Sequence, residues 1–399
     1  MTRRRTPRRL LASLAVLALL AAAGCSGSSL DDEDTSADGT IKVGLLTPQT
    51  GVYKAFDKDI NQGWQLYLDS HGGKLGGHKI EVVKADEGEG KKTAQTSAKK
   101  LLDKDKVDVI VGTASADAVV SIMGLVNEHK VPLIGTGGRP STLKDVSYVW
   151  HASWLSAENG EAGADYIRTK VNGPVYAIGP DYIGGYDQVG GFTKAFVKGG
   201  GKLANEDGKT TWTPWPTTTN FLPYLNQIKA SGAKAIYTFY AGTAAIQFIK
   251  DYAASGLATQ IPLYGSGFLT EGSLLTAEGD KAKGVRTVMS YAANLDNAAN
   301  RSFAPAFQQK YGTSPSIFCV TGWDAALVLD RAIAKAGANP TSESINKAIG
   351  QLGAIDSPRG QWRFGAGHTP IQPWYLREVK SDGRALSNVV IQNLATLGS

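Results

Sequence analysis

The strongest constraint on the fold is a regular alternation, beginning at residue 40, of short apolar segments with longer segments of helical periodicity. The β-branched run 40–46 predicts a strand, and 60–70 predicts a helix because Trp64, Tyr67 and Leu68 recur at helical spacing. Strands that alternate with helices of this length pair in parallel through right-handed crossovers. We therefore predict an α/β protein built on parallel sheets.

The alternation continues through most of the chain. The run 107–112 is apolar on both faces, which is typical of a central parallel strand. A glycine turn and a second strand are expected within 72–87. Further strands are predicted at 131–135, 174–181, 233–240, 261–267, 285–292, 361–365 and 373–381. Further helices are predicted at 91–105, 115–130, 186–200, 221–232, 242–257, 300–312, 322–337 and 342–351.

These units are too many for one small sheet, and they fall into two groups. We predict two doubly wound parallel-sheet lobes joined by three crossovers near residues 155, 289 and 357. Helices dominate after residue 288, which is explained if the chain finishes lobe 1 late and then returns to lobe 2. The predicted lobe 1 comprises 41–155 and 289–357, and the predicted lobe 2 comprises 156–288 and 358–399.

The N-terminal segment predicts export. Five arginines precede an apolar run at 10–23, and the small residues after it end in Cys25. "AAGC" resembles a bacterial lipobox, which implies that 1–24 are removed and that Cys25 becomes the lipid-bearing first residue. An uncleaved anchor and an ordinary signal peptide are the alternatives, and the pattern leaves Sec or twin-arginine export open. Residues 25–40 are small, polar and acidic, which predicts a flexible tether.

Charge and motifs exclude several classes of function. Without the five leading arginines, 37 basic residues face 36 acidic ones, so nothing favours nucleic acid as a partner. The chain has no G-x-S-x-G, H-E-x-x-H or P-loop motif and no G-x-G-x-x-G behind the first strand, so we expect no enzyme. The five histidines lack metal-ligand spacing, and we expect no cofactor and no metal. Cys319 is expected to be a small buried apolar group.

Several segments together resemble a known family. "GLLTPQTGVYKAFDKDINQGWQLYLDSHGGKLGGHKIEVV", "VDVIVGTASADAVVSI" and "VPLIGTGGRPSTLKD" are similar to lobe 1 of the type I periplasmic substrate-binding proteins of the branched-chain amino acid (leucine/isoleucine/valine) group. "FAPAFQQKYGTSPS" and the segments after it resemble the C-terminal half of that group. The resemblance implies two lobes that close on one small molecule, and an ABC permease with its ATPase as partners. A monomer, held to the outside of the bacterial cell membrane by a lipid on Cys25, is expected.

The lobe 1 part of the site is predicted at the carboxyl ends of two strands, because loops there lead into helix N-termini that favour anions. Ser115 or Ala116 falls where the resembled family uses a serine hydroxyl toward the ligand carboxylate. In "LIGTGGRPSTLKD" the strand end includes Thr136, and Gly138 falls on a position that contributes backbone. Arg139 takes a position usually held by Thr or Ser; it either pairs with a ligand carboxylate or points to solvent as a turn residue.

Aromatic residues complete the predicted site. Phe56 aligns with a ligand-stacking tyrosine of the resembled family. In lobe 2 that family's usual aromatic is replaced by Gly184-Gly185, which leaves Tyr182 and Tyr186 as candidates. Tyr240 and Gly242, in "FYAGTAAIQ", and Phe268, in "GSGF", are expected to line the same cleft. Trp212 and Trp215 are expected to pack on the surface or between the lobes.

One absence suggests the ligand class. Residues 244–246 hold no acid where amino-acid-binding relatives carry a carboxylate for the ligand ammonium, although Asp181 offers a substitute. Because a buried ammonium without a partner is costly, a simple α-amino acid is disfavoured. We expect an importer's solute-binding lipoprotein for a small carboxylate-bearing ligand: a branched-chain or other amino acid, or an aromatic or aliphatic acid. A ligand-sensing lipoprotein that feeds a receptor or sensor kinase is the alternative.

Overall fold

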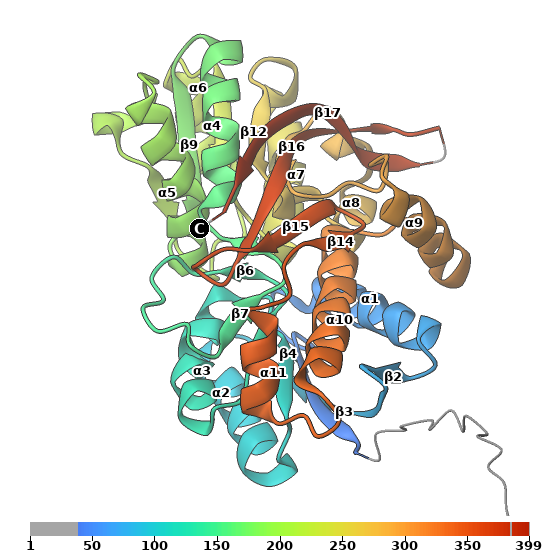
Figure 1. Ribbon diagram of the computed structural model, residues 1–399. Helices are drawn as coiled ribbons and strands as arrows, with labels where there is room; N and C mark the ends of the chain where they lie inside the picture. Colours follow the sequence, from blue (N-terminus) through green and yellow to red (C-terminus); the bar gives the residue numbers. More distant parts are fainter. Residues whose placement is uncertain (1–38, 384, 399) are drawn as a thin grey trace, which may run out of the picture. The chain divides into compact units, whose positions relative to one another are not determined.

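The computed structural model describes residues 39–383 and 385–398. It contains two large sheets with helices packed around them, which the chain connects by crossing three times (Figure 1). The fold is α/β, as predicted, and the predicted boundaries of the lobes remain predictions. In the part of the chain that is described, no helix combines the length and apolarity needed to cross a membrane.

The first sheet has six strands in the order β2-β3-β1-β4-β5-β7. β1 pairs in parallel with β3 and with β4, so the carboxyl ends of the central strands meet at one edge. We call this sheet and the helices that cover it lobe 1. Its strands are β1 Ile41–Thr47, β2 Lys74–Leu75, β3 His78–Asp86, β4 Val109–Gly112, β5 Leu133–Gly135 and β7 Val149–His151. Its helices are η1 Lys54–Phe56, α1 Asp57–Ser70, α2 Lys91–Lys100, η2 Leu101–Asp105, α3 Ala116–His129, α10 Ile317–Ala336 and α11 Ser342–Ile349.

The second sheet, with its helices called lobe 2, is mixed. β10, β9, β11, β12 and β13 are parallel neighbours, whereas β13, β16 and β17 pair antiparallel. Its strands are β9 Val175–Pro180, β10 Thr211–Thr213, β11 Ala235–Thr238, β12 Leu263–Ser266, β13 Arg286–Met289, β14 Ile355–Ser357, β15 Gly360–Phe364, β16 Pro370–Ser381 and β17 Leu386–Leu397. Its helices are α4 Glu158–Val171, α5 Ile183–Lys198, η3 Glu206–Gly208, α6 Leu222–Ala230, α7 Gly242–Ala254, η4 Leu257–Thr259, η5 Gly267–Thr270, α8 Ser273–Glu278 and η6 Gly279–Ala282.

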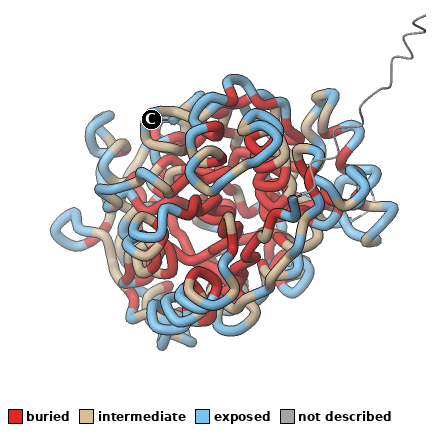
Figure 2. The backbone as a smooth tube through the Cα atoms, turned by 60° about the horizontal axis from the view of Figure 1, so that its bottom comes forward, coloured by how far each residue is buried: buried red, intermediate tan, exposed pale blue. Residues whose placement is uncertain are grey.

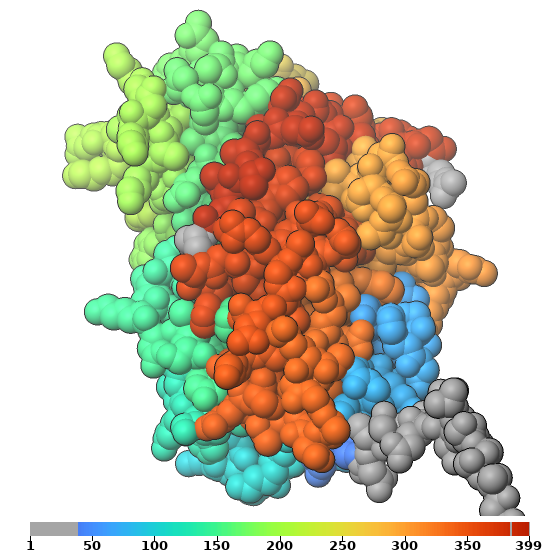
Figure 3. Space-filling view, in the orientation of Figure 1, coloured from blue at the N-terminus to red at the C-terminus, as the bar shows by residue number. Residues whose placement is uncertain are grey.

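Three elements lie between the lobes. β6 Gly138–Arg139 pairs in parallel with β8 Trp154–Leu155 along the first crossover. α9 Ala298–Tyr311 follows the second crossover. In the space-filling view, the orange-to-red C-terminal part of the chain runs over this face from one lobe to the other (Figure 3).

Several elements were not predicted from the sequence, among them α4 and β17. α4 carries Gly160 and Gly163, which weaken its helical pattern, but a Cβ at Gly160 would overlap the backbone of α5 at Gln188 and Phe192. Gly160 therefore permits close packing of α4 on α5, and Gly163 permits close approach to Val288 of β13. β17 is stabilised by its long antiparallel pairing with β16, which no local pattern indicates. The first helix begins at Asp57, earlier than predicted, after the short η1 turn.

Buried residues gather in the interior of the molecule, while the outer turns of the chain are mostly exposed (Figure 2). The largest apolar core runs from lobe 2 into the lobe 1 residues Tyr53, Phe56 and Ile60. Arg359, which follows the third crossover, is fully buried and donates to the carbonyls of Ala152 and Ser153 on the first crossover, at 2.7 Å each. The crossovers are thus tied together by one side chain.

Candidate functional site

Eight aromatic side chains from both lobes meet between the two sheets. They come from η1, β8, the loops that follow β9 to β12, and the first turn of α10. We call this set the aromatic cluster: Tyr53, Phe56, Trp154, Tyr182, Trp215, Phe239, Phe268 and Phe318.

Phe268 of lobe 2 is the centre of the cluster. Its ring meets Phe56 at 5.8 Å and Phe318 at 5.3 Å between centroids, both edge-on, and these two lobe 1 rings stack on each other at 4.1 Å. Trp154 and Phe239 also meet Phe268 edge-on. Rings of the two lobes therefore pack directly on one another, in geometries that aromatic pairs prefer.

A second group of rings joins the lobes through hydroxyl groups. The hydroxyl of Tyr53 contacts that of Tyr182 across the lobes, and the ring of Tyr182 stacks on Trp215 at 4.7 Å. Burial raises the pKa of both hydroxyls above the normal tyrosine range. Both hydroxyls therefore remain neutral donors at physiological pH.

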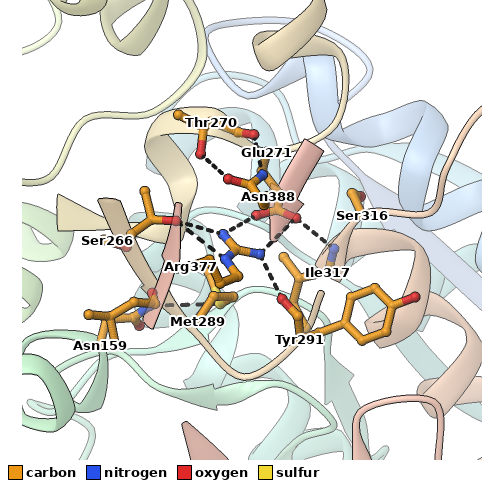
Figure 4. A network of polar contacts seen from close by, with 12 residues as sticks. Asn159, Ser266, Thr270, Glu271, Met289, Tyr291, Ser316, Ile317, Arg377 and Asn388 are labelled. Atoms are coloured by element: carbon orange, nitrogen blue, oxygen red, sulfur yellow. Dashed lines mark hydrogen bonds and ion pairs between the residues drawn. The ribbon is translucent and has the colours of Figure 1, made fainter. Parts of the chain in front are cut away.

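A buried polar network fixes the backbone around Phe268 and Phe318 (Figure 4). Glu271, just after Phe268, pairs with Arg377 of β16 at 2.8 Å and accepts from the N–H of Ile317 at 3.0 Å. Thr270 and Asn388 exchange two hydrogen bonds of 2.7 Å. The network thus ties the segment with Phe268 to the start of α10, which bears Phe318.

Arg139 lies in β6, which pairs with the strand that bears Trp154 of the cluster. Its neighbour Gly138 pairs with Trp154, and Asp187 acts electrostatically on both Arg139 and Tyr182. Arg139 is only 6% exposed, so it does not extend into solvent as a turn residue would. Its Nη1 has one long contact of 3.5 Å, to the carbonyl of Pro140, and its Nε has no hydrogen-bond partner. Within residues 39–383 and 385–398 it forms no ion pair.

Two carboxyl groups near Arg139 are themselves perturbed. Burial raises the pKa of Glu158 to about 8, with Glu161 adding to the shift and Arg139 opposing it. Burial also raises the pKa of Asp187, which accepts a hydrogen bond of 2.8 Å from the N–H of Ser141. The raised pKa favours the neutral form of Glu158, and among the described residues no ion pair joins it to Arg139.

The predicted anion site at the start of α3 already contains an internal acid. The side chain of Glu87 accepts from the N–H of Ala114 at 2.8 Å and from the N–H of Ser115 at 2.7 Å. Burial raises the pKa of Glu87 to about 8, while the two N–H groups oppose that shift by stabilising the ionised form. Ser115 is the N-cap of α3 and makes no side-chain cap bond, and Ala116 begins the helix.

Two glycines of the predicted site allow close approach. A Cβ at Gly138 would lie 2.9 Å from the indole nitrogen of Trp154. A Cβ at Gly242, the first residue of α7, would overlap the carbonyl oxygen of Val52 from the other lobe, and Gly242 has φ of +57°. At Gly242, glycine is therefore required for the two lobes to touch.

Three other predicted residues are used elsewhere. Thr136 is buried and donates to the carbonyl of Thr113 at 3.1 Å, so it ties two strand ends together. Tyr186 is 46% exposed, packs on Trp212 and contacts Asp181. Tyr240 stacks on Phe248 at 4.9 Å inside lobe 2. None of the described ring contacts joins Tyr186 or Tyr240 to the aromatic cluster.

Several members of the aromatic cluster were not among the predicted site residues. Trp215 contacts Tyr53 and Tyr182 between the lobes, which is one of the two placements expected for it. Trp154, Phe239 and Phe318 were not singled out, because each lies next to an apolar run that resembles ordinary core. Glu87 follows a predicted strand at the sheet edge where anion-binding loops were expected, and that position was the available signal.

A separate cavity of about 760 Å³ lies beside the network of Glu271 and Arg377. Its walls include Lys58 and Asp59 of α1 and Thr276 of α8, and none of the predicted site residues lines it. Within the described part of the chain, no three His, Cys, Asp or Glu side chains gather as a metal site. Cys319 is buried, as expected, and Cys25 lies outside the described residues.

Comparison with known proteins supports this architecture. Residues 40–384 match the family described as periplasmic binding protein. A Leu/Ile/Val-binding protein homolog of Brucella melitensis is 27% identical over 371 residues, which are 90% of this chain and 92% of that protein.

Two solved structures of solute-binding proteins of ABC transporters are also similar. One, from R. palustris in complex with benzoate, is 32% identical with a TM-score of 0.81, over 90% of this chain and 98% of that one. Another, from Rhodopseudomonas palustris in complex with 3,4-dihydroxy benzoic acid, is 27% identical with a TM-score of 0.82, over 90% and 98% of the two chains.

Proposed function

The chain belongs to the periplasmic binding protein family, and we propose that its ligand is an aromatic carboxylate bound between the lobes. As a member it is an extracytoplasmic solute-binding protein of the ABC-transporter type and not an enzyme. Two similar proteins are complexes with benzoate and with a dihydroxybenzoate. The finer assignment to this chain depends on its own side chains.

The observation that carries the proposal is the buried guanidinium of Arg139, which has no ion pair among the described residues and belongs to the strand paired with that of Trp154 in the aromatic cluster. A buried charge without a counter-ion is costly, so a ligand that supplies a carboxylate removes an existing penalty. The rings of the cluster present flat apolar faces that suit an aromatic ligand body. A ligand with a benzene ring and a carboxylate would both pair with Arg139 and pack on the rings of the cluster.

Binding proceeds by lobe closure. A ligand enters when the rings of Phe56 and Phe318 separate from Phe268, and it then contacts both lobes at once. Because those contacts exist only in the closed form, the ligand shifts the population toward closure. Contact of Val52 with Gly242 limits how far the lobes approach.

The remaining parts of the function concern delivery. The closed complex passes its ligand to an ABC permease, and a lipid on Cys25 holds the protein at the membrane. Replacement of Cys25 by Ala is expected to release the protein from the membrane fraction of the expressing bacterium. Retention of that variant in the membrane fraction would contradict the lipid anchor.

The test of the ligand class is calorimetric titration of the purified protein with benzoate, 4-hydroxybenzoate, benzamide, leucine and isoleucine. We expect the two acids to bind and benzamide to bind at least about tenfold more weakly, because it lacks the charge that pairs with Arg139. Binding of leucine or isoleucine more tightly than benzoate would refute the proposal.

Two variants separate the aromatic cluster from the 760 Å³ cavity. Tyr182→Ala removes a ring of the cluster and is expected to weaken benzoate binding. Thr276→Trp places an indole at the exposed rim of the cavity and is expected to leave the affinity unchanged. If Thr276→Trp weakens benzoate binding and Tyr182→Ala does not, the ligand binds in the cavity and not at the aromatic cluster.

A further inference from the structure

The cavity of about 760 Å³ has walls from both lobes. Lobe 1 contributes Lys58, Asp59 and Gln62 of α1. Lobe 2 contributes Thr276 of α8 and Ser387 of β17. Pockets that hold small molecules measure roughly 300–1,000 Å³, so this cavity has room for one.

Asp59 lines this cavity without a cationic partner. Its Oδ2 accepts a hydrogen bond of 2.6 Å from the hydroxyl of Ser316, and it forms no ion pair within residues 39–383 and 385–398. Burial raises the pKa of Asp59 to about 6. Glu271, on the lobe 2 wall, is instead paired with Arg377 at 2.8 Å. Because a carboxylate removed from water is costly to ionise without a counter-ion, a cation in the cavity would stabilise ionised Asp59.

The rest of the wall suits a small organic cation. Its polar part consists of hydroxyl and amide groups, such as those of Thr276 and Gln308, and its apolar part includes Leu275, Pro315 and Leu386. A bare metal ion would need several ligands at once, and no three His, Cys, Asp or Glu side chains gather as a metal site among the described residues. An ammonium group on a short aliphatic body matches both parts of the wall.

The cavity is separate from the aromatic cluster, although two segments border both. Phe268 and Glu271 belong to one segment, and Ser316 and Phe318 belong to the other, so each segment carries a ring of the cluster and a group of the cavity wall. The N–H of Ile317 donates to Glu271 at 3.0 Å and joins the two segments. They form a fixed partition between the two sites.

We propose that this cavity is a second binding site, for a small primary amine whose ammonium group pairs with Asp59. Hydroxyl and amide oxygens of the wall accept from the remaining N–H groups of the ammonium, which is a donor only. The aliphatic body contacts the apolar part of the wall, including Leu275 and Leu386. This site does not depend on which ligand the aromatic cluster binds.

The first experiment is calorimetric titration of the purified protein at about pH 8 with butylamine, butan-1-ol and butyrate at equal ionic strength. Butylamine is expected to bind, and the neutral and anionic analogues to bind at least about tenfold more weakly. Asp59→Asn keeps an acceptor for Ser316 and is expected to weaken butylamine binding at least about tenfold. Asp57→Asn, the same change of charge outside this wall, is the matched control. No binding of butylamine to wild type, or an unchanged affinity in Asp59→Asn, would overturn the proposal.

The second experiment locates the amine. Thr276→Trp narrows the cavity at its exposed rim and keeps Asp59, so it is expected to weaken butylamine binding. Tyr182→Ala and saturating benzoate are expected to leave butylamine binding unchanged. Displacement by benzoate, or a loss in Tyr182→Ala without one in Thr276→Trp, would place the amine at the aromatic cluster and refute the second site. If wild type binds no benzoate, the proposed function fails, and the two variants still decide this site.

The third experiment uses pH. Asp59 is ionised above its pKa of about 6, so butylamine affinity is expected to fall by about tenfold between about pH 7.5 and pH 5, and Asp59→Asn is expected to show no such fall. A fall of equal size in Asp59→Asn would assign the titration to another group and refute the role of Asp59. The other charged or titratable groups that line the cavity or interact electrostatically with Asp59 are Lys58, Glu271, Cys319, Arg377 and Asp382.

Discussion

Three buried arginines, Arg139, Arg359 and Arg377, differ in whether a carboxylate of the protein pairs with them. Arg359 pairs with Asp324 at 2.9 Å, and Arg377 pairs with Glu271 at 2.8 Å, each in the core between the lobes. Arg139 is nearly as deeply buried but has no such carboxylate among the described residues. Arg359 and Arg377 are neutralised within the protein, whereas under the proposed function the ligand carboxylate is the partner of Arg139.

The same contrast predicts opposite effects of substitution. Loss of a paired arginine leaves an acid uncompensated in the core and affects folding. Loss of Arg139 removes a charge that the fold does not neutralise and affects binding.

The largest effect is expected for Arg359→Ala. The change leaves Asp324 without its ion-pair partner and the carbonyl of Ala152 without this donor, whereas the carbonyl of Ser153 keeps its hydrogen bond from Gln372. Breaking a buried pair in this way costs about 3–5 kcal/mol of the free energy of unfolding. Urea denaturation measures it, with Arg359→Met/Asp324→Leu as the paired control that restores part of the loss. If Arg359→Ala is as stable as wild type, the paired arginine does not differ from Arg139 in its effect on folding.

Arg139→Ala is expected to weaken benzoate binding at least tenfold, because a charge-assisted hydrogen bond contributes about 1.5–3 kcal/mol. The free energy of unfolding should change by less than about 1 kcal/mol, since no paired acid is left behind. Calorimetry and denaturation on the same preparation measure both quantities. An unchanged affinity would show that Arg139 is not the carboxylate partner.

Gly242→Ala tests the contact that limits closure. Its Cβ would overlap the carbonyl of Val52, and φ of +57° is strained for alanine. We expect a loss of benzoate affinity of about 1–2 kcal/mol through the closed form. Gly190→Ala, where nothing lies within 4 Å of the new Cβ, is the matched control. Equal affinities of both variants would argue against closure through this contact.

The smallest effect is a pH dependence. Glu158, with a pKa of about 8, is mainly neutral below that value and becomes an anion above it. Since an anion beside Arg139 repels the ligand carboxylate, benzoate affinity should fall several-fold as pH rises through about 8. Glu158→Gln should flatten the profile. A fall that persists in this variant must come from another group, such as Asp187.

The repeating pattern of strands and helices was sufficient to predict the α/β fold. Phe56, Tyr182 and Phe268, predicted as site residues, lie together in the aromatic cluster. The partnership of Glu87 with the amides of α3 could not be predicted, because it depends on how two loop ends fit to within a hydrogen-bond length. Antiparallel β17 was also missed, since its pairing partner is set by the sheet and not by its own sequence.

The packing of Phe56 and Phe318 on Phe268 has a consequence for affinity. These rings cover one another, so an incoming ligand ring displaces apolar contacts that the protein makes with itself. The measured affinity is then the free energy of the contacts between the ligand and the rings, less that of the contacts between rings that the ligand replaces. Replacing a ring of the cluster that contacts only other rings, and not the ligand, would weaken these internal contacts. Such a change is expected to raise the affinity for the ligand.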